Sequence, residues 1–424
     1  RHINKVIAKF DTGGISSKES YQKLIKKEQE EVLVTHFEFF LKEHKQYEEK
    51  VRKFQNPPYS KVTQLLKNRI SKFFLLSFIQ ALTFFHIKNK LLLRSLLKIN
   101  INPNRIYGLD ILRALAILFV VLGHSGGLLP SARNKYLSYF VFDGVSIFFV
   151  LSGFLIGGIL IKLLVKEGFN LKTILNFWKR RWFRTLPNYF LILTIILALH
   201  YFFIEGFTVT DKWSYLVFSQ NLFVPHPAFF PEAWSLSIEE WFYLLIPIFI
   251  FVLINLFKCS TQKAILITAV GILVSVTLFR YYRYVTMDID TIKTWDLVFR
   301  KQVFTRLDSL MYGVIGAYVY FYHSAIWNKY KIPLLFIGIF LFITERYNLF
   351  GLDALGVYGC VFSFSINALG TLLILPFLSN LKTGKGFIYK SLTYISLISY
   401  SMYLINYVIV KYWIIGIIDW SYLE

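Results

Sequence analysis

The chain has 424 residues, of which 55% are hydrophobic and 19% aromatic, and its formal net charge is +22. Apolar runs of roughly 18 residues or more recur, which indicates a polytopic membrane protein. In such a protein the excess of lysine and arginine orients the helices, so no nucleic-acid partner is expected. Two cysteines, Cys259 and Cys360, supply neither a disulfide framework nor a metal-ligand cluster, so no metal is expected.

The first part of the chain, residues 1–104, is polar and charged, and we expect it to be a partly helical cytoplasmic segment. The stretch from Ser17 to Phe54 predicts one or two amphipathic helices, which "QNPPYS" (55–60) ends. The apolar run 73–87 is short for a membrane span and favours an interfacial or packed helix. The chain opens without Met, so we expect it to be a fragment.

Residues 105–424 predict an all-α membrane bundle of about nine spans. The loop at 165–186 is rich in lysine and arginine, which places it in the cytoplasm, while the loop at 207–235 is expected outside. Odd-numbered spans then run outward from a cytoplasmic N-terminal segment. The expected spans are 108–129, 140–164, 187–206, 236–257, 263–283, 304–323, 332–349, 354–379 and 392–416.

The first span, "RALAILFVVLGHSGG" from Arg113, carries two ionisable residues among apolar ones. Arg113 and His124 are eleven residues apart, so they share a helix face at about 16 Å along the axis, with Asp110 nearby on that face. Ionisable groups in a span face the bundle interior and mark functional sites, although a structural ion pair or a capped helix end is the alternative. His124 is therefore a candidate general base or acid.

The second span begins with Asp143, at the same outer level as His124. An acid in this place is a candidate for orienting the imidazole. Gly153 and Gly157 form G-x-x-x-G, which favours close helix packing over a functional role.

Three arginines, Arg180, Arg181 and Arg184, lie at the expected cytoplasmic end of the third span. Arg180 and Arg184 share a helix face with Arg181 beside them, and guanidinium forks suit the phosphates of a nucleotide-bearing cofactor. Positive-inside anchoring is the alternative explanation.

The fourth span opens with "EAWSLSIEEWFYLLIP", in which Glu239 and Glu240 are adjacent, so only one can point fully inward. We expect either at about the depth of His124 and Asp143. The alternative is that these acids only mark the end of the span.

These stretches resemble the membrane acyltransferase family 3, the O-acetyltransferases of bacterial surface polysaccharides. The similar segments occur in order between residues 105 and about 410, and they are "GLDILRALAILFVVLGH", "DGVSIFFVLSGFLI", "RRWFRTLP", "AWSLSIEEWFY", "RLDSLMYG" and "ISYSMYLIN". The resemblance implies a multi-pass bundle in the bacterial inner membrane. It also implies that a cytoplasmic acyl-CoA, with acetyl-CoA the expected donor, acylates an extracytoplasmic or lipid-linked glycan. The family's Arg–ten residues–His motif is matched by Arg113 and His124. The arginines assigned to the donor are matched by Arg180, Arg181 and Arg184. The family glutamate is matched by Glu239.

Two features depart from the family. Asn406 stands where the family usually has a histidine, and a neutral amide cannot titrate. The chain also ends soon after the ninth expected span, whereas the family usually has ten. Residues 1–85 resemble the tail of a family 2 glycosyltransferase, although no nucleotide-sugar aspartates are present.

The resemblance implies that CoA phosphates bind near Arg180, Arg181 and Arg184, and that the pantetheine arm enters past Arg113. His124, oriented by Asp143 or Glu239, would then deprotonate the sugar hydroxyl. A covalent route through Ser125 or Ser146 is the alternative chemistry. A glycan transporter or flippase and an inactive scaffold subunit are the alternative functions.

Overall fold

The structure, a computed structural model, describes residues 105–125, 139–167 and 170–415, and the expectations for residues 1–104 lie outside this part of the chain. The described residues form helices without a strand, which confirms the all-α prediction. The longer helices are α6 (Tyr107–His124), α8 (Gly144–Glu167), α9 (Leu171–Phe203), α10 (Ala233–Asn255), α11 (Thr261–Thr286), α13 (Leu307–Tyr322), α15 (Lys331–Tyr347), α16 (Ser363–Leu378) and α17 (Gly386–Ile405).

Short helices join or extend these elements. They are η2 (Trp213–Tyr215), α12 (Ile292–Trp295), the π-helical η3 (Asp296–Arg300), α14 (Ser324–Lys329), the π-helical η4 (Tyr358–Phe362), which leads into α16, and the π-helical η5 (Asn406–Ile414), which continues α17.

Each of the nine expected spans overlaps one long helix. Seven helices within the described residues are long and apolar enough to cross a membrane, when η4 is counted with α16 and η5 with α17. The other two, α13 and α15, have 16 and 17 residues. The chain is therefore a multi-pass membrane protein.

The third helix differs from its prediction because α9 begins at Leu171, so most of the expected 165–186 loop is helical. Asn170 caps this helix, since its Oδ1 accepts a hydrogen bond from the Thr173 backbone N–H at 2.9 Å. The lysines and arginines that follow are good helix formers, so the charged segment extends the span by several turns.

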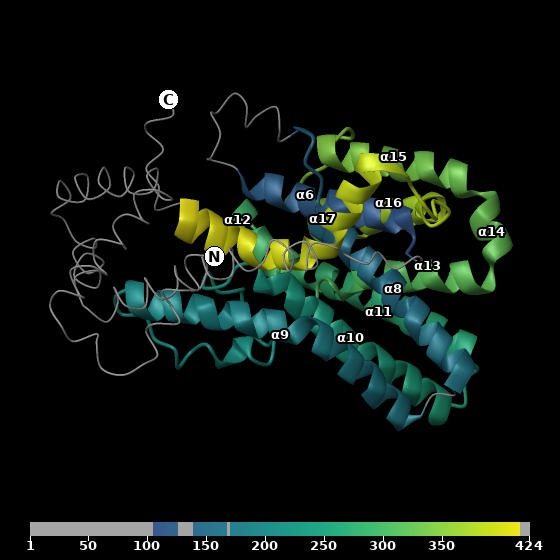
Figure 1. The fold of residues 1–424 in the computed structure, drawn as a ribbon, viewed down its shortest axis with the longest axis horizontal. Helices are drawn as coiled ribbons and strands as arrows, with labels where there is room; N and C mark the ends of the chain where they lie inside the picture. Colours follow the sequence, from purple (N-terminus) through teal and green to yellow (C-terminus); the bar gives the residue numbers. More distant parts are fainter. Residues whose placement is uncertain (1–104, 126–138, 168–169, 416–424) are drawn as a thin grey trace, which may run out of the picture. The chain divides into compact units, whose positions relative to one another are not determined.

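Helix α8 lies at the centre of the bundle and packs most closely on α13 (Figure 1). A Cβ atom added to Gly153 would stand 1.9 Å from the carbonyl oxygen of Leu310, and one added to Gly313 would stand 2.0 Å from that of Val150. Gly157 likewise faces α13, at Ala317. The packing role expected for Gly153 and Gly157 is therefore confirmed.

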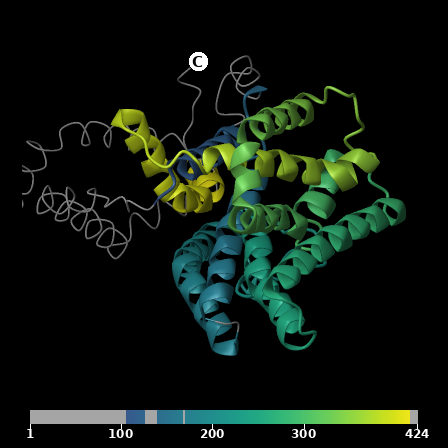
Figure 2. The same ribbon diagram turned by 90° about the vertical axis from the view of Figure 1, so that its right-hand side faces the viewer.

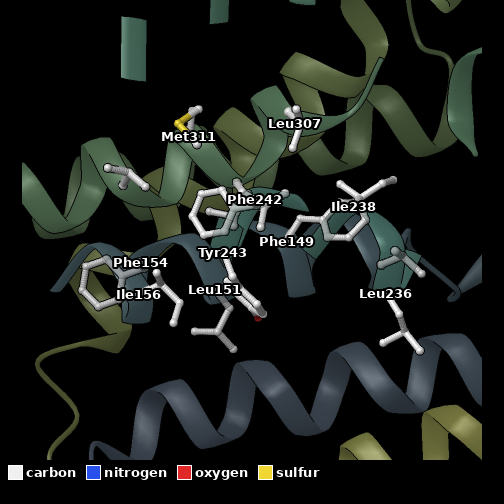
Figure 3. Packing of buried hydrophobic residues seen from close by; sticks show 14 of the residues in the cluster. Phe149, Leu151, Phe154, Ile156, Leu236, Ile238, Phe242, Tyr243, Leu307 and Met311 are labelled. Carbon is white, nitrogen blue, oxygen red and sulfur yellow. The ribbon is translucent and has the colours of Figure 1, made fainter. Parts of the chain in front are cut away.

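Aromatic and branched side chains of α8, α10 and α13 fill the core. Figure 3 shows Phe149 and Phe154 of α8, Phe242 of α10 and Met311 of α13 among the side chains of this buried cluster. In the turned view, α9 and α10 extend together to one side, while α15 and α16 lie on the other (Figure 2). Helix α17 packs on α6, which brings the α17–η5 junction beside the end of α6 that carries His124.

Candidate active site

Two polar cavities lie along α6, one towards each end of the helix. The first, which we call the arginine cavity, has a volume of about 530 Å³, and its polar lining includes Arg105, Arg113, Lys162, Arg181, Arg184 and Glu239. The second, the histidine cavity, has a volume of about 360 Å³, and its polar lining includes His124, Asp143, Glu232, Arg300 and Lys301. The structure therefore separates Arg113 from His124, although both lie on α6.

Arg113 lines the arginine cavity without a hydrogen-bond or ion-pair partner among the described residues. The ion pair of α6 is instead formed by Asp110, whose Oδ2 accepts from Arg105 Nε at 2.9 Å. Ser396 of α17 donates to the same carboxylate at 2.7 Å. Since Asp110 is satisfied by these two residues, the alternative of a structural ion pair does not account for Arg113 or His124.

The three arginines of α9 surround adjoining spaces. Arg181 and Arg184 line both the arginine cavity and a smaller cavity of about 290 Å³, and Arg180 lines the smaller one. Arg180 and Arg184 are exposed. The guanidinium groups are thus placed where an anionic ligand could reach them from the end of the bundle.

Arg181 belongs to a hydrogen-bond network centred on Tyr243 of α10. The Tyr243 hydroxyl donates to Glu239 Oε2 at 2.7 Å and accepts from Arg181 Nη2 at 2.9 Å. Ser152 Oγ of α8 lies 2.9 Å from the same hydroxyl. Because the Tyr243 hydroxyl donates its proton to Glu239, Ser152 is the donor in this second hydrogen bond. The Arg181 guanidinium also lies over the Tyr243 ring, 4.6 Å from its centroid.

Glu239 therefore faces Tyr243 and the arginine cavity, whereas the sequence suggested a place beside His124. Its neighbour Glu240 accepts a hydrogen bond from Thr185 of α9 at 3.1 Å. Glu240 thus contacts α9 directly, whereas Glu239 is linked to α9 only through Tyr243 and its hydrogen bond with Arg181. The structure does not bring Glu239 to the imidazole, so it cannot orient His124 in this arrangement.

His124 is oriented by Asn406, the first residue of η5. The His124 Nδ1 is hydrogen-bonded to Asn406 Oδ1, and Asn406 Nδ2 donates to the Tyr403 carbonyl at 2.7 Å. The hydrogen bond to the Tyr403 carbonyl fixes the orientation of the Asn406 side-chain amide, so that the amide oxygen faces the imidazole. Because this oxygen can only accept a hydrogen bond, His124 Nδ1 carries the proton. Nε2 is then the basic nitrogen of the neutral ring, and it has no hydrogen-bond partner in the described part of the chain. The Tyr407 ring packs edge-on against His124 at 4.9 Å.

Asp143 lines the same cavity as His124, but its contacts are with the start of α8. Its Oδ1 accepts from the backbone N–H groups of Val145 at 3.2 Å and Ser146 at 3.3 Å, so Asp143 is the N-cap of the helix. Its Oδ2 accepts from the Ser146 hydroxyl at 2.5 Å. No hydrogen bond joins Asp143 to His124 within the described residues.

Arginines also surround Asp143. Arg300 lies 3.9 Å from the carboxylate, and Arg306 donates to Ser146 Oγ at 2.7 Å. Burial alone would raise the pKa of Asp143, but the nearby Arg300 and Arg306 guanidiniums and the Ser146 hydrogen bonds hold that pKa below its usual value. Asp143 is therefore an anion at neutral pH.

The sequence reasoning missed Glu232 as a residue of this site. Its Oε1 accepts from the backbone N–H groups of Tyr407 at 2.9 Å and Val408 at 3.0 Å, which fixes the segment that carries Asn406. Its Oε2 is buried without a hydrogen-bond partner among the described residues. Burial raises the pKa of Glu232 to about 7, although the two backbone donors lower it. No sequence pattern links Glu232 to a segment so distant in the chain.

The candidate serine nucleophiles are engaged in local contacts. Ser125 Oγ donates to the Leu122 carbonyl at 2.7 Å, and Ser146 Oγ is fully buried between Asp143 and Arg306. Within the described residues, no group of three or more His, Cys, Asp or Glu side chains could hold a metal ion.

These features define a multi-pass membrane protein with a cation-lined cavity and an imidazole-lined cavity on one helix. Residues 106–423 match the acyltransferase domain family. The chain therefore belongs to this family of membrane acyltransferases, as its motifs predicted.

Curated relatives include O-acetyltransferases of two bacteria. The chain is similar to the O-acetyltransferase OatA of Staphylococcus aureus (strain NCTC 8325 / PS 47), with 29% identity over 341 residues, which cover 73% of this chain and 51% of the relative. It is also similar to the peptidoglycan O-acetyltransferase OatA of Listeria monocytogenes serovar 1/2a, with 30% identity over 185 residues, 40% of this chain and 28% of the relative. The chain thus spans about half the length of the Staphylococcus relative. No solved structure matches it.

Proposed function

We propose that the chain is an O-acetyltransferase that moves an acetyl group from acetyl-CoA to a hydroxyl of a cell-envelope glycan. The observation that carries the proposal is the arrangement of one α6 face. Within the part of the chain that the structure describes, Arg113 has no hydrogen-bond or ion-pair partner in a cation-lined cavity, and His124, whose Nε2 has no partner, lines a second cavity. The family and the O-acetyltransferase relatives support the same reaction. The glycan of the Listeria relative is peptidoglycan, and we propose a glycan of this class as acceptor.

The arginine cavity binds the donor in this proposal. Its guanidiniums offer forked donors to the CoA phosphates, which form short, charge-assisted hydrogen bonds. Arg180 and Arg184 are exposed and suit the nucleotide end, while Arg113 lies deeper, where the pantetheine arm would pass. In this proposal the arginine cavity faces the cytoplasm, because acetyl-CoA is a cytoplasmic compound. The membrane is then the bacterial inner membrane, and the N-terminal segment lies in the cytoplasm.

In the proposed reaction, His124 Nε2 takes the proton from the acceptor hydroxyl as its oxygen attacks the thioester carbonyl carbon. The carbon–sulfur bond breaks, the acetyl group stays on the glycan oxygen, and the CoA thiolate takes the proton from the imidazolium. Asn406 keeps the productive tautomer and Asp143, an anion in the same cavity, stabilises the imidazolium. Glu239 acts as a positioning residue, because it holds Tyr243 and through it Arg181.

The test follows transfer from radiolabelled acetyl-CoA to soluble glycan fragments by purified, detergent-monodisperse chain. Arg184→Ala should raise the apparent KM for acetyl-CoA by about 10- to 100-fold, since a lost charged hydrogen bond costs about 1.5–3 kcal/mol. The KM for the acceptor should change little. Lys179 is an exposed residue of the same helix that lines none of these cavities. Lys179→Ala should therefore leave the KM for acetyl-CoA and the KM for the acceptor unchanged.

The alternatives predict other results. A transporter or flippase would move glycan across vesicle membranes without acetyl-CoA, and a scaffold subunit would transfer no label. If Arg184→Ala and Lys179→Ala have the same KM for acetyl-CoA, the arginines of α9 serve to orient the helix in the membrane and do not bind the donor.

A further inference from the structure

The wall between the two cavities is thin and is built largely from aromatic residues. Among the described residues, Val145 of α8 and Tyr403 of α17 line both cavities. Beside them, Phe149 lines the arginine cavity and Trp234 lines the histidine cavity, and their rings meet edge to face at 5.9 Å. We call these four residues the septum.

Hydrogen bonds hold Tyr403 across this septum. Its hydroxyl lies 2.6 Å from Ser235 Oγ, on the arginine-cavity side, and donates to the Glu232 carbonyl at 3.1 Å, on the histidine-cavity side. Both partners belong to the first residues of α10 and its N-cap, so the tyrosine connects α17 to α10 where the cavities meet. Its side chain is buried, and it lies where the cavity of Arg113 and the cavity of His124 meet.

The proposed function requires that the acyl carbonyl reach the imidazole. A donor bound by the arginines approaches from the arginine cavity, and His124 lies in the other. The acyl group must therefore cross the septum, and the two side chains that line both cavities, Val145 and Tyr403, fix the space available to it.

We propose that Tyr403 is the gate between the donor and acceptor cavities and that its ring limits the length of the acyl group transferred. The proposal rests on the proposed function and goes beyond it, because it assigns acyl-chain selection to one residue. Tyr403 is a specificity-determining residue that acts by volume, while its two hydrogen bonds keep the cavities apart when no donor is bound. A two-carbon acyl group passes with a small displacement of the ring, whereas a longer chain meets the aromatic wall.

The experiment compares transfer from acetyl-CoA and hexanoyl-CoA to the same glycan acceptor. Tyr403→Ala removes the ring, so the ratio of hexanoyl to acetyl transfer should rise at least about tenfold, the scale of discrimination that a pocket wall exerts on a few methylene groups. Tyr394→Ala is the matched control, because Tyr394 is an exposed tyrosine of the same helix and lines neither cavity. It should leave the ratio within about twofold of the parent.

Tyr403→Phe separates the ring from the hydroxyl. It keeps the wall but loses both hydrogen bonds, so the acyl ratio should stay at the parental value while release of free acetate without acceptor increases. If Tyr403→Ala does not fold, Val145→Ala widens the septum from the opposite wall and should raise the same ratio.

An unchanged ratio in folded Tyr403→Ala, or in Val145→Ala where the first variant is unstable, would overturn the gate. An equal rise in Tyr394→Ala would also overturn it. These outcomes differ from failure of the proposed function, in which the parent chain itself transfers no acyl group.

Discussion

His124 and Glu232 lie in one cavity, and both act on the same short segment of η5. Asn406 of this segment accepts a hydrogen bond from the imidazole, and Tyr407 packs on the ring. Glu232 holds the backbone of Tyr407 and Val408. The amide at position 406 cannot titrate, but orientation of the imidazole requires only an acceptor, which the amide oxygen supplies. Asn406 is therefore compatible with catalysis by His124.

The first residue-scale prediction concerns the general base. His124→Gln should lower acetyl transfer by about 10²- to 10⁴-fold, because an amide keeps hydrogen bonding but cannot take the proton. Expression and the size-exclusion profile should match those of the parent. Transfer per milligram of folded protein is the measurement, and near-parental activity in His124→Gln would show that the histidine is architectural.

The second residue-scale prediction concerns Glu232 and pH. The carboxyl has its usual pKa of 4.5 when unfolded and a pKa of about 7 in the fold, so the folded chain holds an extra proton between these values. Stability should therefore fall as pH rises through this window, by about 3 kcal/mol in total from this group. Thermal unfolding in detergent at several pH values measures the effect.

Glu232→Gln stays neutral at every pH and should flatten this dependence. Glu205→Gln changes an exposed acid and should keep the parental slope. His124 and Asp143 also titrate in the cavity, but they are present in both variants, so the difference isolates Glu232. Parallel curves for parent and Glu232→Gln would contradict the assignment.

At the scale of elements, the contact between α8 and α13 sets the central spacing of the bundle. Gly153 and Gly313 bring backbone against backbone, and no side chain stands between the two helices at these points. The close approach fixes α8, and with it Asp143 at one end and Ser152 along its length.

Gly153→Ala should therefore destabilise the chain by about 1–3 kcal/mol, the range of overpacked sites, because the added methyl meets a backbone carbonyl that cannot rotate away. Gly271→Ala is the control in α11, where an added Cβ meets nothing within 4 Å. It should be neutral or stabilising through helix propensity. Thermal midpoints in detergent give the comparison, and equal midpoints would indicate that α8 and α13 can separate freely.

At the scale of the molecule, the two cavities give the bundle a direction, from cations at one end of α6 to the imidazole at the other. A cytoplasmic donor and an external acceptor would place these ends on opposite sides of the membrane. The lysines and arginines that begin α9 favour the cytoplasm for the donor end.

Cysteine labelling tests this orientation. On a background in which Cys259 and Cys360 are replaced, Phe207→Cys should react with a membrane-impermeant maleimide added to intact cells, and Asn176→Cys should react only after lysis. Asn176 lies in the second turn of α9, and Phe207 follows the last residue of this helix. Labelling at 176 without labelling at 207 would invert the topology and move the donor cavity outside.

The sequence alone determined the long helices of the described residues, the helix face shared by Arg113 and His124, and the arginine cluster of α9. These features depend on local hydropathy and on the helical repeat, which operate within one segment. Tertiary structure decided which residues meet. In the folded chain His124 is hydrogen-bonded to Asn406, 282 positions away, and Asp143 caps the first turn of α8. Glu239 accepts a hydrogen bond from Tyr243 and does not reach His124. Such contacts depend on how neighbouring helices are rotated and shifted along one another, and close packing at positions such as Gly153 sets that register, which no single segment encodes.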